Sequence, residues 1–419
     1  MSNTKRFLTA LSVHEFEALM EEIDCKIPRL EIIRVDQALS RVLAEDISSN
    51  INVPPFHKSR VDGYAVKAED TFEASEETGI TLNVIGEVKM GKGAEGKIQS
   101  GQTIYVPTGG MIPEGADAVV KIEYTKKTGG PGTLEKKVEI FTAVTPGQSI
   151  TPLGADLKEK SVFLEKNTSL TTARLGSLAA AGIEEIKVFE KIRVGLFSSG
   201  NEIVEPGKEL SPGKIYDVNS LTVKFLILES GCDVNFYGIV GDEMNFLRDI
   251  FSQVLSENDV IICSGGTSKG RGDLMPVVIE EHPGTTIEVH GVKIKPGKPL
   301  IFALIEGKPV FVLPGNPTSA MMTYIRLVDP FIRRNNGLPA RASEKIKANL
   351  TKRVYSEFGR RELKAIILSR SEDGKTLANP VPKGSETITT LLNANGYLEV
   401  PENVELIEKD SLIDVILFK

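Results

Sequence analysis

Acidic, hydroxyl and glycine residues follow several apolar runs that are typical of strands. SSGNE, with Glu202, follows IRVGLF, and GDE, with Asp242, follows NFYGIV. SGGTSKGRGD (264–273), which ends in Asp273, follows DVIIC, and PGNPTS follows PVFVL. In open α/β sheets, ligands bind beyond the carboxyl ends of the strands, where helix N-termini also point. These loops therefore predict one ligand site at one edge of a sheet.

The composition of the loops predicts a site for phosphate with a divalent cation. Glycines allow backbone N–H groups to approach an anion, and hydroxyl groups add donors; the residues expected in this role are Ser264, Gly265, Gly266, Thr267 and Ser268. Carboxylates repel phosphate, so a cation is expected between them. Mg²⁺ held by one or two of the carboxylates and by phosphate oxygens meets that need.

Each of these signals also has a purely structural interpretation. Asp242 and Asp273 stand just before helices, where aspartate is usually an N-cap. A glycine loop after a strand can be a plain turn, and Glu202 can be a solvated loop acid. The convergence of several such loops on one edge favours the functional interpretation.

A basic segment, KIKPGKP (293–299), supplies a second kind of group. Pro296 and Pro299 stiffen it, so Lys295 and Lys298 become fixed positive charges for an anion, although ordinary surface lysines in a turn are an equal alternative. The sequence has no HExxH, CxxC or Walker motif. The absence of HExxH and CxxC argues against a histidine–thiolate metal site.

The totals limit the class of protein. The chain has 419 residues, 41% of them hydrophobic and 26% charged, which predicts a soluble protein of several domains. No apolar run is long enough for a membrane span and no signal peptide is recognised, so a cytoplasmic location is expected. A net charge of -7 argues against a nucleic-acid partner. The three cysteines are expected to be buried thiols.

The pattern of apolar residues predicts the elements that position these groups. Between about residues 190 and 335, short β-rich runs alternate with helical patterns, which predicts a doubly wound, mostly parallel sheet. Its helices are expected at 220–230, capped by Asn219 or Ser220, at 244–258, capped by Asp242, and after Asn316-Pro317. Residues 50–150 and the tail from 338 look β-rich, with a hairpin at Asp373-Gly374. The flanks, about 5–48 and 155–188, look helical.

Taken together, these segments resemble one known family. The matching stretches are PPFHKSRVDGYAV, VPTGGMIPEGADAVV, GADL, FSSGNEI, IYDVNS, SGGTSKGRGD, IKPGKPL, LPGNPTSA and GSETITTLLNANGYLEVP. The set resembles the molybdopterin molybdenumtransferases, a family that includes the C-terminal catalytic part of gephyrin. The resemblance implies Mg²⁺-dependent insertion of molybdate into adenylylated molybdopterin, with cleavage of the adenylate and release of AMP.

The resemblance also implies a multidomain α/β and β architecture. An elongated, helical linking domain would comprise residues 1–48 and 154–190, with a β-rich domain inserted at 49–153. A doubly wound, molybdopterin-binding α/β domain would follow at 191–336, and a C-terminal β-barrel-like domain at 337–419. It further implies a homodimer whose clefts are shared between subunits, and possible contact with the molybdopterin adenylyltransferase.

Residue roles follow from the matched motifs. The resemblance assigns catalytic roles to Asp62, Thr108, Asp156, Glu202, Asp242 and Asp273, with Asp242 and Asp273 as the metal ligands. It assigns substrate binding to the loop 264–268 and to Lys295, Pro296, Lys298, Pro299, Pro314, Asn316 and Ser385. One departure is clear: the family often has arginine shortly before its GxD motif, where this chain has Thr151 and Leu153.

Three alternatives stay open at this stage. Tungstate is nearly the same size and charge as molybdate, so residue types do not separate the two. The adenylyltransferase that makes the adenylate resembles residues 190–335 alone, whereas this chain also has the VDGYAV and C-terminal segments. A gephyrin-like scaffold is the third alternative, although a scaffold has no need to keep all the acids.

Overall fold

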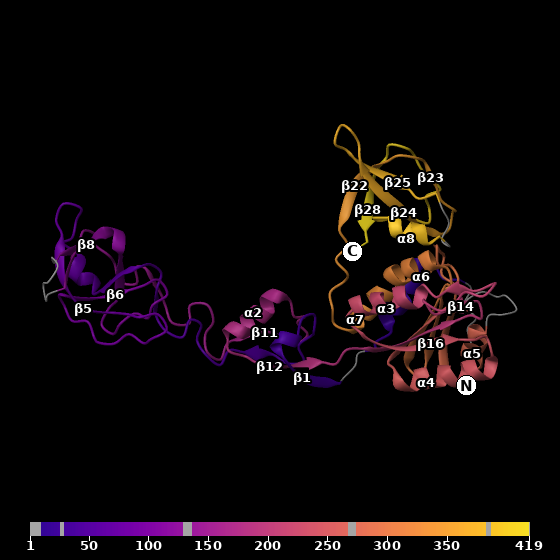
Figure 1. Ribbon diagram of the computed structural model, residues 1–419, viewed down its shortest axis with the longest axis horizontal. Coiled ribbons are helices and arrows are strands. Elements are labelled where there is room, and N and C mark those ends of the chain that lie inside the picture. Colours follow the sequence, from indigo (N-terminus) through magenta and orange to yellow (C-terminus); the bar gives the residue numbers. More distant parts are fainter. Residues whose placement is uncertain (1–9, 26–28, 129–135, 267–273, 383–386, 419) are drawn as a thin grey trace. The chain divides into compact units, whose positions relative to one another are not determined.

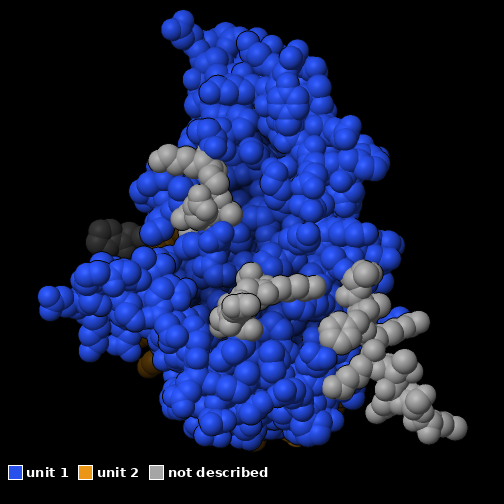
Figure 2. Space-filling view, turned by 90° about the vertical axis from the view of Figure 1, so that its right-hand side faces the viewer, with its two compact units in different colours: residues 1–31, 40–42, 188–419 blue, residues 32–39, 43–187 orange. Residues whose placement is uncertain are grey.

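The structure is a computed structural model that describes residues 10–25, 29–128, 136–266, 274–382 and 387–418. The chain forms two compact units, coloured separately in Figure 2. Unit 1 comprises Met1–Glu31, Ser40–Val42 and Val188–Lys419, and unit 2 comprises Ile32–Leu39 and Leu43–Lys187. The finer four-domain boundaries stay a prediction. Within the described residues, no helix is both long and apolar enough to cross a membrane.

The α/β part of unit 1 is built on a six-stranded sheet of order β16-β13-β17-β21-β20-β18. Its strands are β13 (Arg193–Ser199), β16 (Asp233–Val240), β17 (Val260–Ser264), β18 (Thr285–His290), β20 (Ile301–Ile305) and β21 (Lys308–Leu313). The first four in spatial order run parallel, as expected. β20 and β18 add an antiparallel edge that the sequence did not predict.

Helices cover both faces of this sheet (Figure 1). They are α3 (Asn219–Glu229), α4 (Met244–Glu257), α5 (Met275–Glu281), α6 (Pro317–Thr323) and α7 (Asp329–Asn335), with a π-helical turn, η4 (Tyr324–Val328), joining α6 to α7. Leu196 and Ile262 enter the core on the α3 side, and their neighbours Phe197 and Cys263 enter the core under α4 and α5. Burial on both faces explains why the strands are continuous apolar runs.

The N-terminal helix α1 (Val13–Glu22) belongs to unit 1. Val13, Phe16 and Met20 lie on one helical face and are buried in the same core as Phe302 of β20. Residues 1–48 were expected in the linking domain, whereas α1 packs in unit 1. An amphipathic helix shows only which face it buries, not which distant element it packs against.

The C-terminal part of unit 1 is a closed barrel. Strands β24 (Arg361–Arg370), β25 (Thr376–Pro380), β22 (Lys345–Leu350), β28 (Leu412–Leu417) and β26 (Gly396–Val400) pair in that order, and β26 pairs back to β24. β24 and β25 form the hairpin expected around Asp373-Gly374. Further short elements of unit 1 are β14 (Ile203–Val204), β15 (Ile215–Tyr216), β19 (Ile294–Lys295), β23 (Val354–Tyr355), α8 (Ile388–Asn393) and β27 (Leu406–Ile407).

Unit 2 contains the predicted β-rich segment. Its main sheet has the order β7-β4-β6-β5-β9-β8, formed by β4 (Gly63–Val66), β5 (Ile80–Glu87), β6 (Gln102–Val106), β7 (Ala118–Lys121), β8 (Thr125–Thr128) and β9 (Lys137–Ile140). Short pairs join β3 (Lys58–Ser59) to β10 (Ile150–Thr151), and β2 (Ile47–Ser48) to β11 (Val162–Leu164). The remaining elements are β1 (Leu30–Arg34), η1 (Val35–Gln37), η2 (Ala68–Thr71), η3 (Ile122–Tyr124), α2 (Thr172–Ala180) and β12 (Glu185–Phe189).

Candidate functional site

The carboxyl ends of three neighbouring parallel strands meet at one edge of the α/β sheet. Ser198 of β13 pairs with Ser264 of β17, and Ser264 pairs with Leu313 of β21. The next residue, Gly265, donates its N–H to the Leu313 carbonyl at 3.1 Å and has a φ of +97°. A Cβ at Gly265 would lie 2.3 Å from the Ser199 carbonyl oxygen. Only glycine fits here, because both the dihedral angle and the space exclude a side chain.

Asp242 lies at this edge and is not a helix cap. Its carboxylate accepts hydrogen bonds from the Ser199 hydroxyl and the Asn201 N–H, both at 3.2 Å. The residue before α4 is Glu243, and no side chain caps that helix. The expectation that Asp242 caps α4 is therefore wrong. Its carboxylate is held by the loop after β13, which leaves it available at the predicted site.

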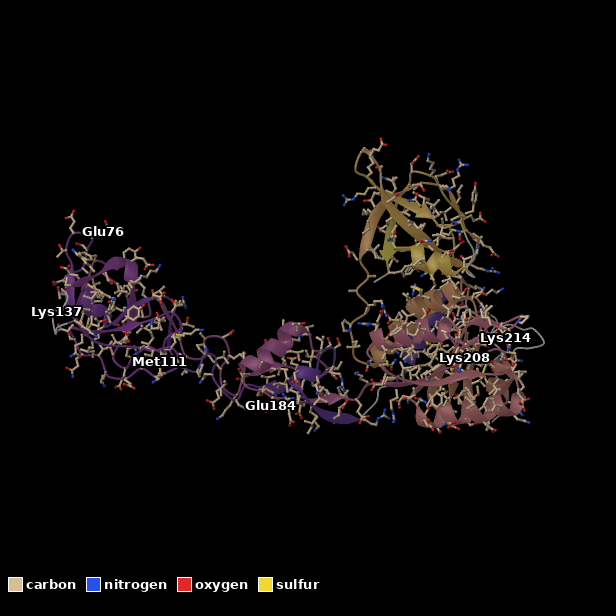
Figure 3. The ribbon with its side chains drawn as sticks, viewed as in Figure 1. Glu76, Met111, Lys137, Glu184, Lys208 and Lys214 are labelled. Atoms are coloured by element: carbon tan, nitrogen blue, oxygen red, sulfur yellow. The ribbon has the colours of Figure 1, made fainter. Side chains whose placement is uncertain are left out.

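Glu202 belongs to the same loop. A Cβ at Gly200 would lie 2.7 Å from Glu202 Oε2, so the carboxylate folds back close over the glycine. The amine of Lys214, labelled in Figure 3, donates to the Asn201 carbonyl between them. The loop is further tied to β15 by the Ile215 N–H, which donates to the Glu202 carbonyl at 2.8 Å.

Asp217 and Asn219 are functional candidates that the sequence analysis missed. The N-cap residue of α3 is Val218, not Asn219 or Ser220 as expected, and Asp217 just before it accepts the Ser220 N–H with its Oδ1 at 3.0 Å. Asp217 and Asn219 are 4% and 8% exposed, yet Asp217 Oδ2 and Asn219 Oδ1 have no hydrogen-bond partner among the described residues. The only sequence signal was their place in the quoted IYDVNS stretch.

A cavity of about 670 Å³ lies between the α/β part and the barrel. It is lined by the predicted residues Lys295, Pro296, Lys298, Pro299, Pro314 and Asn316, which the structure brings together. Barrel residues Arg360, Glu362 and Lys364 complete the wall, and the sequence analysis missed all three. Four cationic side chains thus face the cavity against one carboxylate, so it is suited to an anion.

Glu362 is the carboxylate of this cavity and is only 3% exposed. Its oxygens lie 3.6 Å from Lys295 Nζ and 3.8 Å from Lys364 Nζ. A carboxylate buried to this degree is stable when it is paired with positive charge. Glu362 therefore lies close to two of the lysines, while Arg360 pairs with Glu357 at 2.7 Å, so Lys298 is left to supply positive charge to the cavity.

Unit 2 brings together two further predicted residues. Asp62 Oδ1 accepts the Thr108 N–H at 2.8 Å, which ties the VDGY and VPTGG segments to each other. The Asp62 carbonyl also accepts the Ile122 N–H at 3.0 Å. Gly63 follows in β4, where a Cβ would lie 2.0 Å from the Val120 carbonyl oxygen. The backbone around Asp62 is therefore fixed from both sides.

The segment with the missing arginine lies beside a different arginine. Arg60 Nε donates to Thr151 Oγ1 at 3.1 Å, and Leu153 N–H donates to His57 Nδ1 at 3.2 Å. Asp156, a few residues further on, is exposed and is held by its own N–H, which donates to the Val53 carbonyl at 2.9 Å. Arg60 thus places a guanidinium group where the GADL segment itself has none.

The other predicted residues cannot be placed. Thr267, Ser268, Asp273 and Ser385 lie outside the described residues. Among the residues that are described, no cluster of three or more His, Cys, Asp or Glu side chains is suited to a metal ion. Asp242 is the described member of the expected pair of Mg²⁺ ligands, and the roles of all the predicted site residues stay predictions.

The cysteines take no part in this site. Cys232 and Cys263 are buried, and all three cysteines are free thiols. Burial raises the pKa of Cys25 to about 12 and that of Cys232 and Cys263 further above the usual range. The expected buried thiols are confirmed for Cys232 and Cys263, whereas Cys25 is only partly buried.

Comparison with family models matches nearly the whole chain. Residues 11–182 match the MoeA N-terminal region (domain I and II), and residues 347–418 match the MoeA C-terminal region (domain IV). Residues 196–334, which carry the sheet edge described above, match a "Probable molybdopterin binding domain".

Named relatives and solved structures agree. The molybdopterin molybdenumtransferase of Haemophilus influenzae is 34% identical over 88% of this chain and 89% of its own length. Molybdopterin molybdenumtransferase 2 of Mycobacterium tuberculosis H37Rv is 31% identical over 94% and 96%. The crystal structure of a molybdopterin biosynthesis MoeA protein from Pyrococcus horikosii has a TM-score of 0.82 and 36% identity, covering 98% of this chain and 100% of that one.

Proposed function

Because this chain belongs to the molybdopterin molybdenumtransferase family of molybdenum cofactor biosynthesis, we propose that it inserts molybdate into adenylylated molybdopterin with release of AMP. The cationic cavity beside the molybdopterin-binding sheet edge carries this proposal, because it offers one site for a small oxyanion next to another for a phosphorylated pterin. Pro314 belongs to both sites, because it directly follows β21 at the sheet edge and also lines the cavity.

Residues at the sheet edge bind the phosphates and orient the reacting groups. The turn at Ser264-Gly265 brings backbone close to the phosphates, and Ser199 and Asn201 orient the Asp242 carboxylate. The oxygen donors of Asp242 fit Mg²⁺, which would neutralise charge on the phosphates when bound. A carboxylate orients the water or molybdate oxygen that bonds to phosphorus, while the anhydride P–O bond breaks and its electron pair leaves with the departing phosphate.

Release of AMP tests the proposed reaction. With the purified chain and adenylylated molybdopterin, we expect AMP to appear only when molybdate and Mg²⁺ are both present. AMP release that does not need molybdate would contradict metal insertion. Formation of adenylate from ATP and molybdopterin would favour the adenylyltransferase alternative, and no turnover at all would favour a scaffold. Replacing molybdate by tungstate in the same assay measures which metal the chain prefers.

Removing one lysine from the cavity is predicted to weaken binding of molybdate. Lys298→Ala deletes a charge-assisted contact, and such contacts are worth roughly 1.5–3 kcal/mol. We therefore expect the KM for molybdate to rise about tenfold or more while kcat stays nearly unchanged. Lys293→Ala is the matched control, because Lys293 is an exposed residue of the same segment and does not line the cavity. Equal KM values for the two variants would remove Lys298 from the oxyanion site.

Arg60 is proposed to supply the positive charge that the GADL segment lacks. We expect Arg60→Ala to raise the KM for the anionic substrate several-fold, in line with loss of one charge-assisted contact at an exposed position. Adding Thr151→Arg to that variant is expected to recover part of the loss, because the hydrogen bond of Arg60 to Thr151 shows that the two positions are adjacent. An unchanged KM in the single variant would contradict this role.

A shared cleft is proposed between Asp242 of one subunit and Asp62 of its partner. If so, light scattering at micromolar concentration gives twice the chain mass of 45.6 kDa. Mixing two inactive variants, Asp62→Asn and Asp242→Asn, is expected to restore part of the activity, because some mixed dimers then contain one intact cleft. A monomer mass, or no recovery in a mixture that demonstrably exchanges subunits, would contradict the shared cleft.

A further inference from the structure

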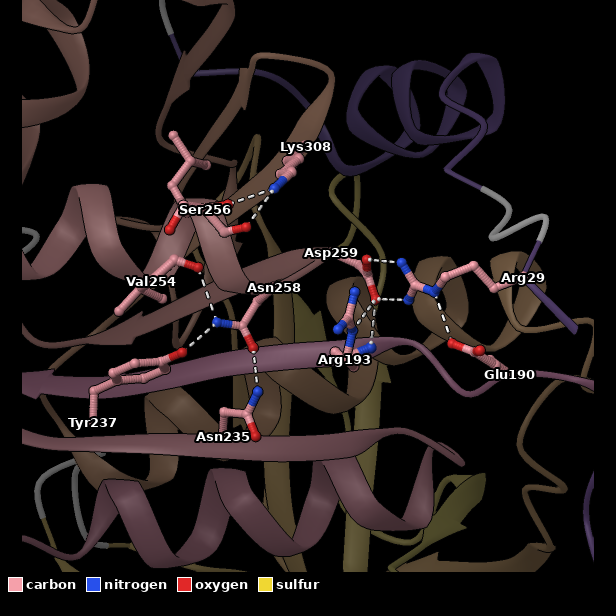
Figure 4. A network of polar contacts seen from close by, with 11 residues as sticks. Arg29, Glu190, Arg193, Asn235, Tyr237, Val254, Ser256, Asn258, Asp259 and Lys308 are labelled. Atoms are coloured by element: carbon pink, nitrogen blue, oxygen red, sulfur yellow. Dashed lines mark hydrogen bonds and ion pairs between the residues drawn. The ribbon is translucent and has the colours of Figure 1, made fainter. Parts of the chain in front are cut away.

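The polar groups at the amino ends of the sheet strands are paired. Figure 4 shows Asp259, just before β17, accepting from the Arg29 guanidinium at 2.8 and 3.1 Å and from the Arg193 N–H at 2.8 Å. Asn258 beside it donates to Val254 O and Tyr237 Oη and accepts from Asn235. This end of the sheet satisfies its buried polar atoms within the chain, as most protein interiors do.

The carboxyl ends of the strands are different. Asp217 uses only Oδ1, for the Ser220 N–H. Asn219 donates to the Gly315 carbonyl at 2.7 Å and leaves Oδ1 unused. Among the described residues, Asp217 Oδ2 and Asn219 Oδ1 accept no hydrogen bond, although both residues are more than nine-tenths buried. Each such atom costs roughly 1–3 kcal/mol, so a ligand with matching donors would offset that cost.

These two acceptors lie at the same edge as the proposed phosphate turn. The side-chain amide of Asn219 donates a hydrogen bond to the Gly315 carbonyl, and a Cβ on Gly315 would lie 3.9 Å from the Gly265 Cα. Burial raises the pKa of the Cys263 thiol near the end of β17, and the charges of Asp242 and Asp217 raise it further. These contacts place Asn219, and Asp217 two residues before it, near the Gly265 turn that is proposed to hold the phosphates.

We propose that Asp217 and Asn219 are specificity-determining residues that recognise the 2-amino-4-oxo edge of the pterin. That edge carries two neighbouring donors, the ring N3–H and the 2-amino group. The chain has two acceptor oxygens, on Asp217 and Asn219, that receive no hydrogen bond from the described residues. Pairing a flat donor edge with a carboxylate gives strong, directional hydrogen bonds, as in guanidinium–carboxylate pairs. This inference rests on the proposed function, because it presupposes that a molybdopterin binds here.

The ribose hydroxyls of the AMP group are the competing ligand for a carboxylate. A hydroxyl group both donates and accepts, so it also pairs with an asparagine side chain. The N3–H and amino groups of a pterin only donate, so the amide NH₂ of an asparagine faces them without an acceptor. Asp217→Asn therefore separates the two ligands, and its carbonyl oxygen can still cap the Ser220 N–H.

The experiment measures binding of molybdopterin and of AMP separately, under anaerobic conditions, to the full chain. We expect Asp217→Asn and Asp217→Ser to weaken binding of molybdopterin at least tenfold and to leave the Kd of AMP within about twofold. Serine can also cap α3, so both variants are expected to fold, with melting curves as the check. Asp233→Asn, at the opposite end of β16, is the matched control for loss of one charge.

A second readout tests recognition of the edge itself. Wild type is expected to bind 6-hydroxymethylpterin more tightly than 6-hydroxymethyllumazine, which has a carbonyl in place of the 2-amino group, and Asp217→Asn is expected to lose that preference. Two results would overturn the inference in a wild-type chain that still releases AMP. One is an equal loss of affinity for molybdopterin and AMP in Asp217→Asn, and the other is an unchanged preference of that variant for the pterin over the lumazine. Failure of wild type to bind molybdopterin at all would instead overturn the proposed function.

Discussion

Gly265→Ala is expected to abolish turnover and to lower the stability of unit 1. The added Cβ would stand 2.3 Å from the Ser199 carbonyl oxygen, a backbone atom that cannot rotate away, at a φ of +97°. Overpacking and backbone strain of this kind each cost roughly 1–3 kcal/mol. The strain can be relieved only by parting the ends of β13 and β17, which are the two strands that form the site.

The measurements are AMP release and thermal unfolding followed by circular dichroism. We expect activity below about 1% of wild type, because misplacement of a reacting group by 1 Å can itself cost about 10²-fold. Gly176→Ala is the control: Gly176 lies within α2, where an added Cβ meets nothing within 4 Å, so the change is expected to be neutral or stabilising. Normal turnover in Gly265→Ala would show that the β13 and β17 ends do not need their close contact.

Asp242→Asn is expected to lower turnover by roughly 10²-fold or more while leaving the fold intact. Asparagine has nearly the same shape and can still accept from the Ser199 hydroxyl, but it lacks the negative charge that the proposed Mg²⁺ needs. The dependence of rate on Mg²⁺ concentration is expected to shift to higher concentrations. That shift distinguishes loss of a metal ligand from loss of a purely structural hydrogen bond.

Asp249→Asn is the matched control for Asp242→Asn. Asp249 is an exposed residue on α4, the helix that follows Asp242, and its replacement removes the same charge from the same region. We expect it to keep wild-type rates and wild-type Mg²⁺ dependence. Wild-type rates in both variants would remove Asp242 from the site, whereas equal losses in both would indicate that general charge near the edge is what matters.

Two helix starts show where local patterns mislead. Aspartate before a helix usually caps it, so the sequence predicted Asp242 as the cap of α4 and overlooked Asp217, which precedes α3 by two residues. In the structure it is Asp217 whose side chain accepts a hydrogen bond from the first turn of α3, and Asp242 is held by Ser199 and Asn201. Those last two partners lie at the end of β13 and just after it, some 40 residues earlier in the chain, and Asp242 meets them only because β16 pairs with β13.

By itself, the sequence determined the alternation of strands and helices, the loops in which acids and glycines follow strands, and the family. These properties depend on neighbouring residues, because apolar periodicity and turn chemistry act over a few positions. Only the tertiary structure decided that Arg360 and Glu362 of the barrel face Lys295, and that Asp217 keeps a buried oxygen without a partner. Such contacts arise when segments far apart in the chain pack together, and no local pattern records which segments meet.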